Sequence, residues 1–181
     1  MEFDYSDIVV TVKLDEKTFK RFARFDMFSR RKKWIRPALF SLILIVFAFI
    51  ALLALLARKE QSGVIAAVLL VVGIGLPLVY VGTFLSQVNM QAARANLKPD
   101  QPVYTVTMRD EGVRIVNNRK EEEPQEVSWD SIHRAYRKNG CVYLYVTPAK
   151  AFLLPSKQAD APDHEVWDFI RKRLGEDKCK G

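Results

Sequence analysis

The side chains that could perform chemistry in this sequence are few and widely spaced. His133 and His164 are its two histidines, and Cys141 and Cys179 are its two cysteines. Hydrolysis needs a nucleophile beside a base, and a zinc site needs three or four ligands at close spacing. Neither pattern occurs, and the three glutamates at residues 121–123 are typical of a solvated loop. We therefore expect a protein that is not an enzyme, with no catalytic residue, metal or cofactor.

Basic residues form the most concentrated chemical feature. Residues 1–36 carry ten Lys and Arg against six Asp and Glu, whereas residues 99–181 carry fourteen of each. The net charge of +7 thus lies outside the C-terminal part, which argues against a nucleic-acid partner. The densest group is a candidate topology anchor and binding site for anionic lipid headgroups. Its members are Arg30, Arg31, Lys32, Lys33 and Arg36.

Two long stretches without charged residues follow this basic group. Residues 37–57 and 64–85 contain no Asp, Glu, Lys or Arg. At about 1.5 Å per residue, a helix of either length would cross a hydrocarbon core of about 30 Å. We predict two transmembrane helices joined by an extracytoplasmic loop at residues 58–63. Because Lys and Arg are more numerous on the outer flanks than in this loop, both termini should be cytoplasmic.

The sequence predicts a strand near the N-terminus, and this strand needs a neighbouring strand elsewhere in the chain. Residues 8–14 alternate apolar and polar side chains, as a half-buried strand does. Residues 15–36 read as an amphipathic juxtamembrane helix, and residues 86–98 as a helical stalk after the second span. Residues 99–181 read as six short strands and a C-terminal helix. Since both flanks of the hairpin should face the cytoplasm, we predict that residues 1–14 add a seventh strand to one cytoplasmic β-rich domain.

Two local patterns leave alternatives open. Phenylalanines recur at every third position from Phe19 to Phe28. They favour a helix that packs on the protein's own soluble domain over one that lies on the bilayer. In the second span, Gly73, Gly75 and Pro77 either mark a gate or dimer face or are a tolerated irregularity, and we favour the second interpretation.

Aromatic residues in the β-rich part predict a core and a candidate surface. The expected core residues are Trp129, Ile132, Leu144, Leu154 and Trp167. By strand alternation, Tyr143 and Tyr145 lie on the face opposite to the core. With Tyr136 on the neighbouring strand, they form an aromatic face that we expect to be exposed. We expect this face, or the edge of the sheet, to bind an unknown protein partner.

The stretch VSWDSIHRAYRKNGCVYLYVTPAKAFLLPSK, residues 127–157, resembles the C-terminal signature of the YcxB-like family of small bacterial membrane proteins. The shared features are a Trp followed by an Ile three positions later, the YLYV strand and the AFLLP ending. The two spans and the opening strand and helix are similar as well. The resemblance implies a multi-pass protein of the bacterial plasma membrane with a soluble part like pleckstrin-homology (PH) domains, which have seven strands and a closing helix. It implies no activity.

Two functional hypotheses follow. The first is a membrane-anchored, non-enzymatic interaction or regulatory module that presents a PH-like domain to the cytoplasm, with membrane lipids and a protein as partners. The second is a small transport-associated or immunity-type membrane protein whose hairpin forms a homo-oligomer. Neither span contains a charged side chain, which counts against a conducting role.

Overall fold

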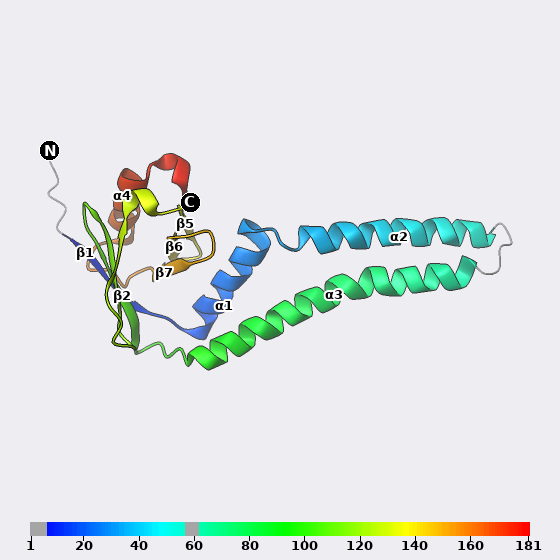
Figure 1. Ribbon diagram of the computed structural model, residues 1–181, viewed down its shortest axis with the longest axis horizontal. Coiled ribbons are helices and arrows are strands. Elements are labelled where there is room, and N and C mark those ends of the chain that lie inside the picture. Colours follow the sequence, from blue (N-terminus) through cyan, green and yellow to red (C-terminus); the bar gives the residue numbers. More distant parts are fainter. Residues whose placement is uncertain (1–6, 57–61) are drawn as a thin grey trace. The chain divides into compact units, whose positions relative to one another are not determined.

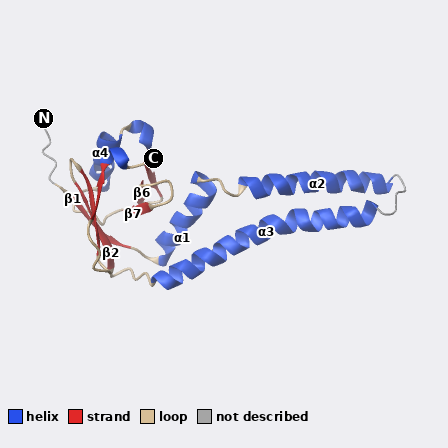
Figure 2. Ribbon diagram, in the orientation of Figure 1, coloured by secondary structure: helices blue, strands red, loops and turns tan. Residues whose placement is uncertain are grey.

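The computed structural model describes residues 7–56 and 62–181. The chain divides into two compact units (Figure 1), one that joins the N-terminal residues up to Glu16 with Leu97–Gly181, and one formed by Lys17–Asn96. The first unit contains all the described strands and the second is helical (Figure 2). The predicted combination of a long helical hairpin with a separate β-rich region is confirmed.

The helical unit is dominated by α2 (Ile35–Leu56) and α3 (Ser62–Ala95), which run antiparallel (Figure 1). The predicted stalk is not a separate element, because α3 continues without a break beyond the second apolar stretch. No Gly or Pro occurs between residues 86 and 95 to end the helix. The predicted loop at residues 58–63 lies outside the described residues except for its last two positions.

Small side chains form the contact between α2 and α3. On each helix two buried small residues are spaced seven positions apart: Ser41 and Ala48 on α2, and Ala66 and Gly73 on α3. The large apolar side chains mostly point outward, and only 11% of the most apolar 18-residue window of each helix is buried. Close helix contact through small residues, with apolar side chains outside, is typical of helices that pack in lipid.

The predicted juxtamembrane helix is wrong in its extent. The α-helix α1 (Glu16–Arg24) continues into a π-helical turn, η1 (Phe25–Arg30), and the chain is then non-helical until Ile35. Lys32 adopts a left-handed conformation with φ of 47°, which a regular helix cannot accommodate. This local backbone break separates α1 and η1 from α2.

The β-rich unit consists of two four-stranded sheets. The first has the order β1-β2-β3-β4 and is antiparallel throughout. Its strands are β1 (Ile8–Lys13), β2 (Pro102–Met108), β3 (Gly112–Asn117) and β4 (Gln125–Ser128). The second has the order β7-β6-β5-β8, with β8 parallel to β5. Its strands are β5 (Arg134–Lys138), β6 (Cys141–Tyr145), β7 (Ala151–Pro155) and β8 (Cys179–Lys180). The described strands number eight instead of seven because the two-residue β8, after helix α4 (Asp163–Leu174), carries no alternation signal.

The opening strand joins the sheet of the C-terminal region, as predicted, and the structure identifies its neighbour. β1 pairs with β2 from Ile8 opposite Met108 to Val12 opposite Tyr104. The pairing joins segments that lie on either side of the whole helical hairpin in the sequence. The first strand is therefore part of the same sheet as the C-terminal region.

The other edge of β1 is bonded by side chains that follow β7. The Val9 amide donates to Asp160 Oδ1 at 2.9 Å. The Lys13 amide donates to Gln158 Oε1 at 2.8 Å, and Gln158 Nε2 donates to the Lys13 carbonyl at 3.0 Å. The carboxamide of Gln158 thus occupies the place of a neighbouring peptide group, so β1 has partners on both edges.

The predicted core residues are buried. Trp129, Ile132, Leu144, Leu154 and Trp167 each keep less than a tenth of their surface exposed. Trp129 begins the 3₁₀ turn η2 (Trp129–Ser131). Its indole Nε1 donates to the Arg109 carbonyl at 2.7 Å, and its ring packs edge-on against Phe169 of α4 with centroids 5.9 Å apart. Trp129 therefore connects the end of β2 with the C-terminal helix.

Candidate functional site

The basic group lies at the backbone break before α2. The Arg31 amide donates to the Asp26 carbonyl at 2.9 Å, and the Lys33 amide donates to the Met27 carbonyl at 3.1 Å. These bonds close the π-helical turn, and the left-handed Lys32 interrupts the helix before α2 begins. Five basic residues are thereby gathered around one turn instead of being spread along a helix.

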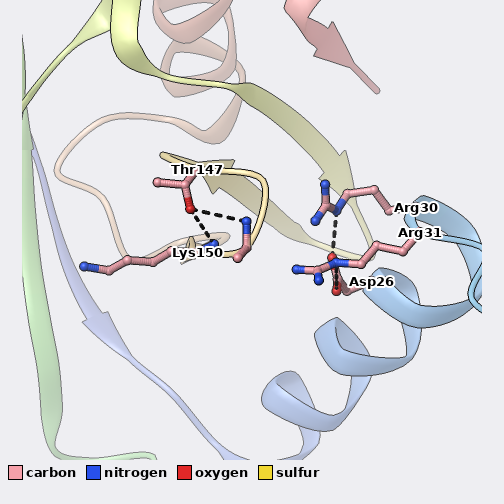
Figure 3. A network of polar contacts seen from close by, with 6 residues as sticks. Asp26, Arg30, Arg31, Thr147 and Lys150 are labelled. Carbon is pink, nitrogen blue, oxygen red and sulfur yellow. Dashed lines mark hydrogen bonds and ion pairs between the residues drawn. The ribbon is translucent and has the colours of Figure 1, made fainter.

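Asp26 divides this group in two (Figure 3). Its Oδ1 accepts from Arg30 Nε, and its Oδ2 lies beside Arg31 Nε, each at 2.7 Å. One carboxylate thus partly neutralises two guanidinium groups. Lys32, Lys33 and Arg36 are exposed, and within residues 7–56 and 62–181 their side chains form no ion pair. These three cations are the members of the predicted headgroup site that could still pair with an anionic group.

Two adjoining cavities lie beside the basic group. The first has a volume of about 520 Å³ and is lined by Arg31, Lys32, Lys33, Arg36, Pro37 and Tyr80. The second, of about 620 Å³, shares Arg31, Lys33 and Tyr80 with the first and extends along α1 and α3. Phe19, Phe22 and Phe84 are among its apolar lining residues.

The phenylalanines of the juxtamembrane segment partly face α3. Phe28 packs edge-on against Phe84 with ring centroids 6.1 Å apart, and Phe19 and Phe22 line the second cavity together with α3 side chains. Neither predicted alternative, the bilayer surface or the soluble domain, included this contact within the helical unit. The sequence gives no signal for it because the two segments are about 60 positions apart.

The predicted exposed aromatic face is wrong for two of its three members. Tyr143 and Tyr145 have no exposed surface, and all five residues of β6 are buried. β6 is an inner strand, with Tyr143 between Tyr136 of β5 and Leu153 of β7. The Tyr145 ring packs edge-on against Tyr136, with centroids 5.6 Å apart. Alternation separates the two faces of a strand correctly, but it does not tell whether the second face is covered.

The glycine and proline pattern of the second span has a role inside the hairpin. Pro77 lacks an amide hydrogen, so it cannot donate to the carbonyl four positions earlier, which is that of Gly73. The buried Ser41 hydroxyl of α2 donates to this same carbonyl. A Cβ at position 73 would lie 3.3 Å from Leu44 Cβ and from Ile45 Cγ1. The pattern therefore supports a close helix contact, which sequence reasoning missed.

The residues considered for chemistry stay apart in the structure. Across the described ranges, no three His, Cys, Asp or Glu side chains are grouped as metal ligands would be. Cys141 is buried and Cys179 is partly exposed, and both are free thiols. Burial raises the pKa of the Cys179 thiol, opposed in part by Arg171, which disfavours its thiolate form.

Comparisons with family models, curated proteins and solved structures find no match to this chain.

Proposed function

We propose that the protein is a membrane-anchored, non-enzymatic interaction or regulatory module. In this proposal α2 and the apolar part of α3 span the plasma membrane of a bacterium, and the β-rich unit is a PH-like domain in the cytoplasm. Membrane lipids are one class of partner and a cytoplasmic protein is the other. The resemblance of residues 127–157 to the YcxB-like family supports the bacterial and PH-like parts of the proposal.

The exposure of the two long helices supports the membrane anchor. In a soluble protein, helical stretches as apolar as these would be covered by other elements. Here residues such as Leu39, Phe49 and Val71 are more than half exposed. A hydrocarbon solvent is the environment in which such surfaces are stable.

The pairing of β1 with β2 supports the proposed two-span topology. These strands precede and follow the helical hairpin in the sequence and are neighbours in one sheet. Two spans return the chain to the side on which it started, so one folded domain can form from both flanks. The basic residues at 30–36 favour the cytoplasm as that side.

The PH-like assignment rests on the order of elements. The seven strands β1 to β7 form two antiparallel sheets, and α4 follows them. This number of strands and the closing helix are those that the family resemblance implies. With Tyr143 and Tyr145 buried, the remaining partner surface that we propose is the outer edge of β4. In the described sheet β4 has a neighbour on one side only, as peptide-binding sheet edges do.

Cysteine labelling in cells tests the proposal. Gln61→Cys places a single thiol in the predicted extracytoplasmic loop, and Lys120→Cys places one on the β-rich unit, where that side chain is 73% exposed. Both variants carry Cys141→Ala and Cys179→Ser. We expect a membrane-impermeant maleimide to label position 61 in intact cells and position 120 only after permeabilisation. Labelling of both positions in intact cells, or release of the protein from membranes by alkaline carbonate, would contradict the proposal.

A further inference from the structure

The first cavity beside the basic group carries an excess of positive charge. Lys32, Lys33 and Arg36 line it, and no carboxylate does. The one carboxylate on the adjoining cavity is Asp26, whose two oxygens contact Arg30 and Arg31. An anionic group that enters the first cavity would therefore meet cations without competition from an acidic neighbour.

This cavity lies where polar and apolar surfaces of the helical unit meet. Arg36 and Pro37 line it at the start of α2. Within one further turn, Leu39 and Phe40 expose 57% and 53% of their surface. Tyr80, on the other side of the cavity, belongs to the last turns of the apolar part of α3. A ligand bound here would have cations at one end and an apolar wall at the other.

Aromatic groups border this junction as they do at membrane interfaces. The Trp34 ring is 43% exposed, and its Nε1 donates to the Phe28 carbonyl at 3.2 Å. This bond holds the indole at the backbone break, next to Lys33 and Arg36 in sequence. Trp and Tyr prefer the depth of lipid headgroups because one part of each ring system is apolar and the other is polar.

We propose that this cavity is a binding site for one anionic glycerophospholipid of the cytoplasmic leaflet. The phosphate lies between Lys33 and Arg36, and the acyl chains follow the exposed apolar face of α2 from Leu39 onward. The proposal rests on the membrane anchor proposed above and adds a defined headgroup class. A free phosphate would satisfy the same cations but would make no use of the apolar wall, so we assign the site to a lipid.

Fluorescence quenching of Trp34 in lipid nanodiscs tests the site with the full-length protein. The Trp34 signal is the difference between the wild-type protein and Trp34→Phe, since Trp129 and Trp167 are buried in the β-rich unit. Brominated phosphatidylglycerol and brominated phosphatidylcholine are compared in a phosphatidylcholine host. We expect the anionic lipid to be preferred at least about fivefold, since each basic side chain at a membrane surface contributes roughly that factor.

Two double variants with equal loss of charge identify the residues. Lys33→Gln with Arg36→Gln should reduce the preference to about one. Lys17→Gln with Arg94→Gln removes two cations of the same helical unit that do not line either cavity, and the preference should remain. If both double variants lose the preference for the anionic lipid, the attraction is an unspecific effect of net charge and the proposed site is overturned.

The remaining outcomes separate this site from the membrane anchor. Equal quenching by both brominated lipids in the wild-type protein would overturn the headgroup site and leave the anchor intact. Absence of quenching by either lipid would place Trp34 away from the bilayer and overturn the lipid site, while the anchor is tested separately by the cysteine labelling described above. Inorganic phosphate in discs of unbrominated phosphatidylcholine is the third arm, and we expect no response. A saturable change in Trp34 fluorescence that Lys33→Gln with Arg36→Gln abolishes would assign the cavity to a soluble anion and overturn the lipid.

Discussion

A single hydroxyl group connects the two sheets of the β-rich unit. Tyr104 on β2 donates to the Leu153 carbonyl at 2.9 Å and accepts from the Leu153 amide at 2.8 Å. Its ring also packs edge-on against Phe152, with centroids 5.4 Å apart. The tyrosine thus takes the place of a missing strand neighbour of β7. Burial raises the pKa of the Tyr104 hydroxyl above its ordinary value of 10.0, although the bond from the hydroxyl to Leu153 lowers it in part.

Tyr104→Phe should lower the free energy of unfolding at neutral pH by about 1–3 kcal/mol, because the Leu153 amide and carbonyl lose their partner. The raised pKa also predicts a pH dependence. Since the folded state keeps Tyr104 neutral, its contribution is complete below about pH 10 and declines as the pH rises further, when the unfolded chain ionises. Urea unfolding followed by Trp fluorescence should give a steeper loss above about pH 10 in the wild-type protein than in the variant. Equal slopes would contradict this role of Tyr104.

Ser41 makes the corresponding contact in the helical hairpin. Its hydroxyl donates to the Gly73 carbonyl, the group that Pro77 leaves without an intrahelical donor. Ser41→Ala should therefore destabilise the hairpin by about 1 kcal/mol, the usual size of such bonds between membrane helices.

A double-mutant cycle isolates this bond. In a Pro77→Ala background the new amide at position 77 can donate to the Gly73 carbonyl, so Ser41→Ala should cost less than half as much there. The measurement is unfolding of the full-length chain in mixed micelles with increasing denaturing detergent. Additive effects of the two substitutions would show that the hydroxyl does not compensate for the proline.

At the scale of elements, the contact between α2 and α3 depends on the position of each glycine. Gly73 faces α2, whereas a Cβ at Gly75 would have no atom within 4 Å. Gly73→Val should separate the helices and cost about 1–3 kcal/mol, while Gly75→Val should change stability little. The two substitutions share the same change in helix propensity, so the difference in detergent unfolding reports the packing alone. Equal effects would contradict the proposed helix interface.

The attachment of β1 depends on Gln158 as well as on β2. Gln158→Ala should lower the free energy of unfolding by about 0.5–1.5 kcal/mol, because the Lys13 amide and carbonyl lose a partner. Glu at this position keeps an acceptor but no donor, so Gln158→Glu should not restore stability. Hydrogen exchange at the Lys13 amide measures the local effect. Gln101→Ala, in the turn before β2, is the control and should leave that exchange rate unchanged.

Periodicity predicted most elements of this fold but not their ends. The apolar runs predicted both long helices, and the alternation of residues 8–14 predicted β1. That β1 joins the C-terminal sheet followed from the expected two-span topology, whereas its pairing with β2 was left open. The sequence predicts a helix over residues 86–98, and α3 does continue there, without a separate start, as far as Ala95. The break at Lys32 was not predicted, because it depends on one left-handed residue. A single backbone angle leaves no periodic signal.

Of the candidate site, only the group of positive charges could be predicted from the sequence. The basic group at 30–36 is visible in the sequence, but its division by Asp26 and the contribution of Tyr80 depend on tertiary contacts. For Tyr143 and Tyr145 the prediction of an exposed surface was wrong, because both side chains are buried. Their face of the sheet follows from alternation, whereas its exposure depends on what covers it.

At the scale of the whole molecule, one β-rich domain is built from both flanks of the helical hairpin, which we propose to span a membrane. The insertion of 88 residues between Lys13 and Pro102 separates two strands that pair directly. In the proposed topology, formation of this sheet therefore requires that both spans have been inserted and that the chain has returned to its original side. The domain and the anchor depend on each other in this arrangement.

The most direct test is a disulfide between β1 and β2 in the membrane-embedded full-length protein. Thr11 and Thr105 lie opposite each other in the sheet, within the distance that a disulfide spans in antiparallel pairs. Thr11→Cys with Thr105→Cys, in a Cys141→Ala and Cys179→Ser background, should form a rapid bond within one chain. Thr11→Cys with Ser128→Cys, which places the second thiol on the distant β4, should not. Peptide mass spectrometry of mixed isotope-labelled chains distinguishes the outcomes: a bond within one chain supports the split domain, whereas bonds between chains, or none, would contradict it.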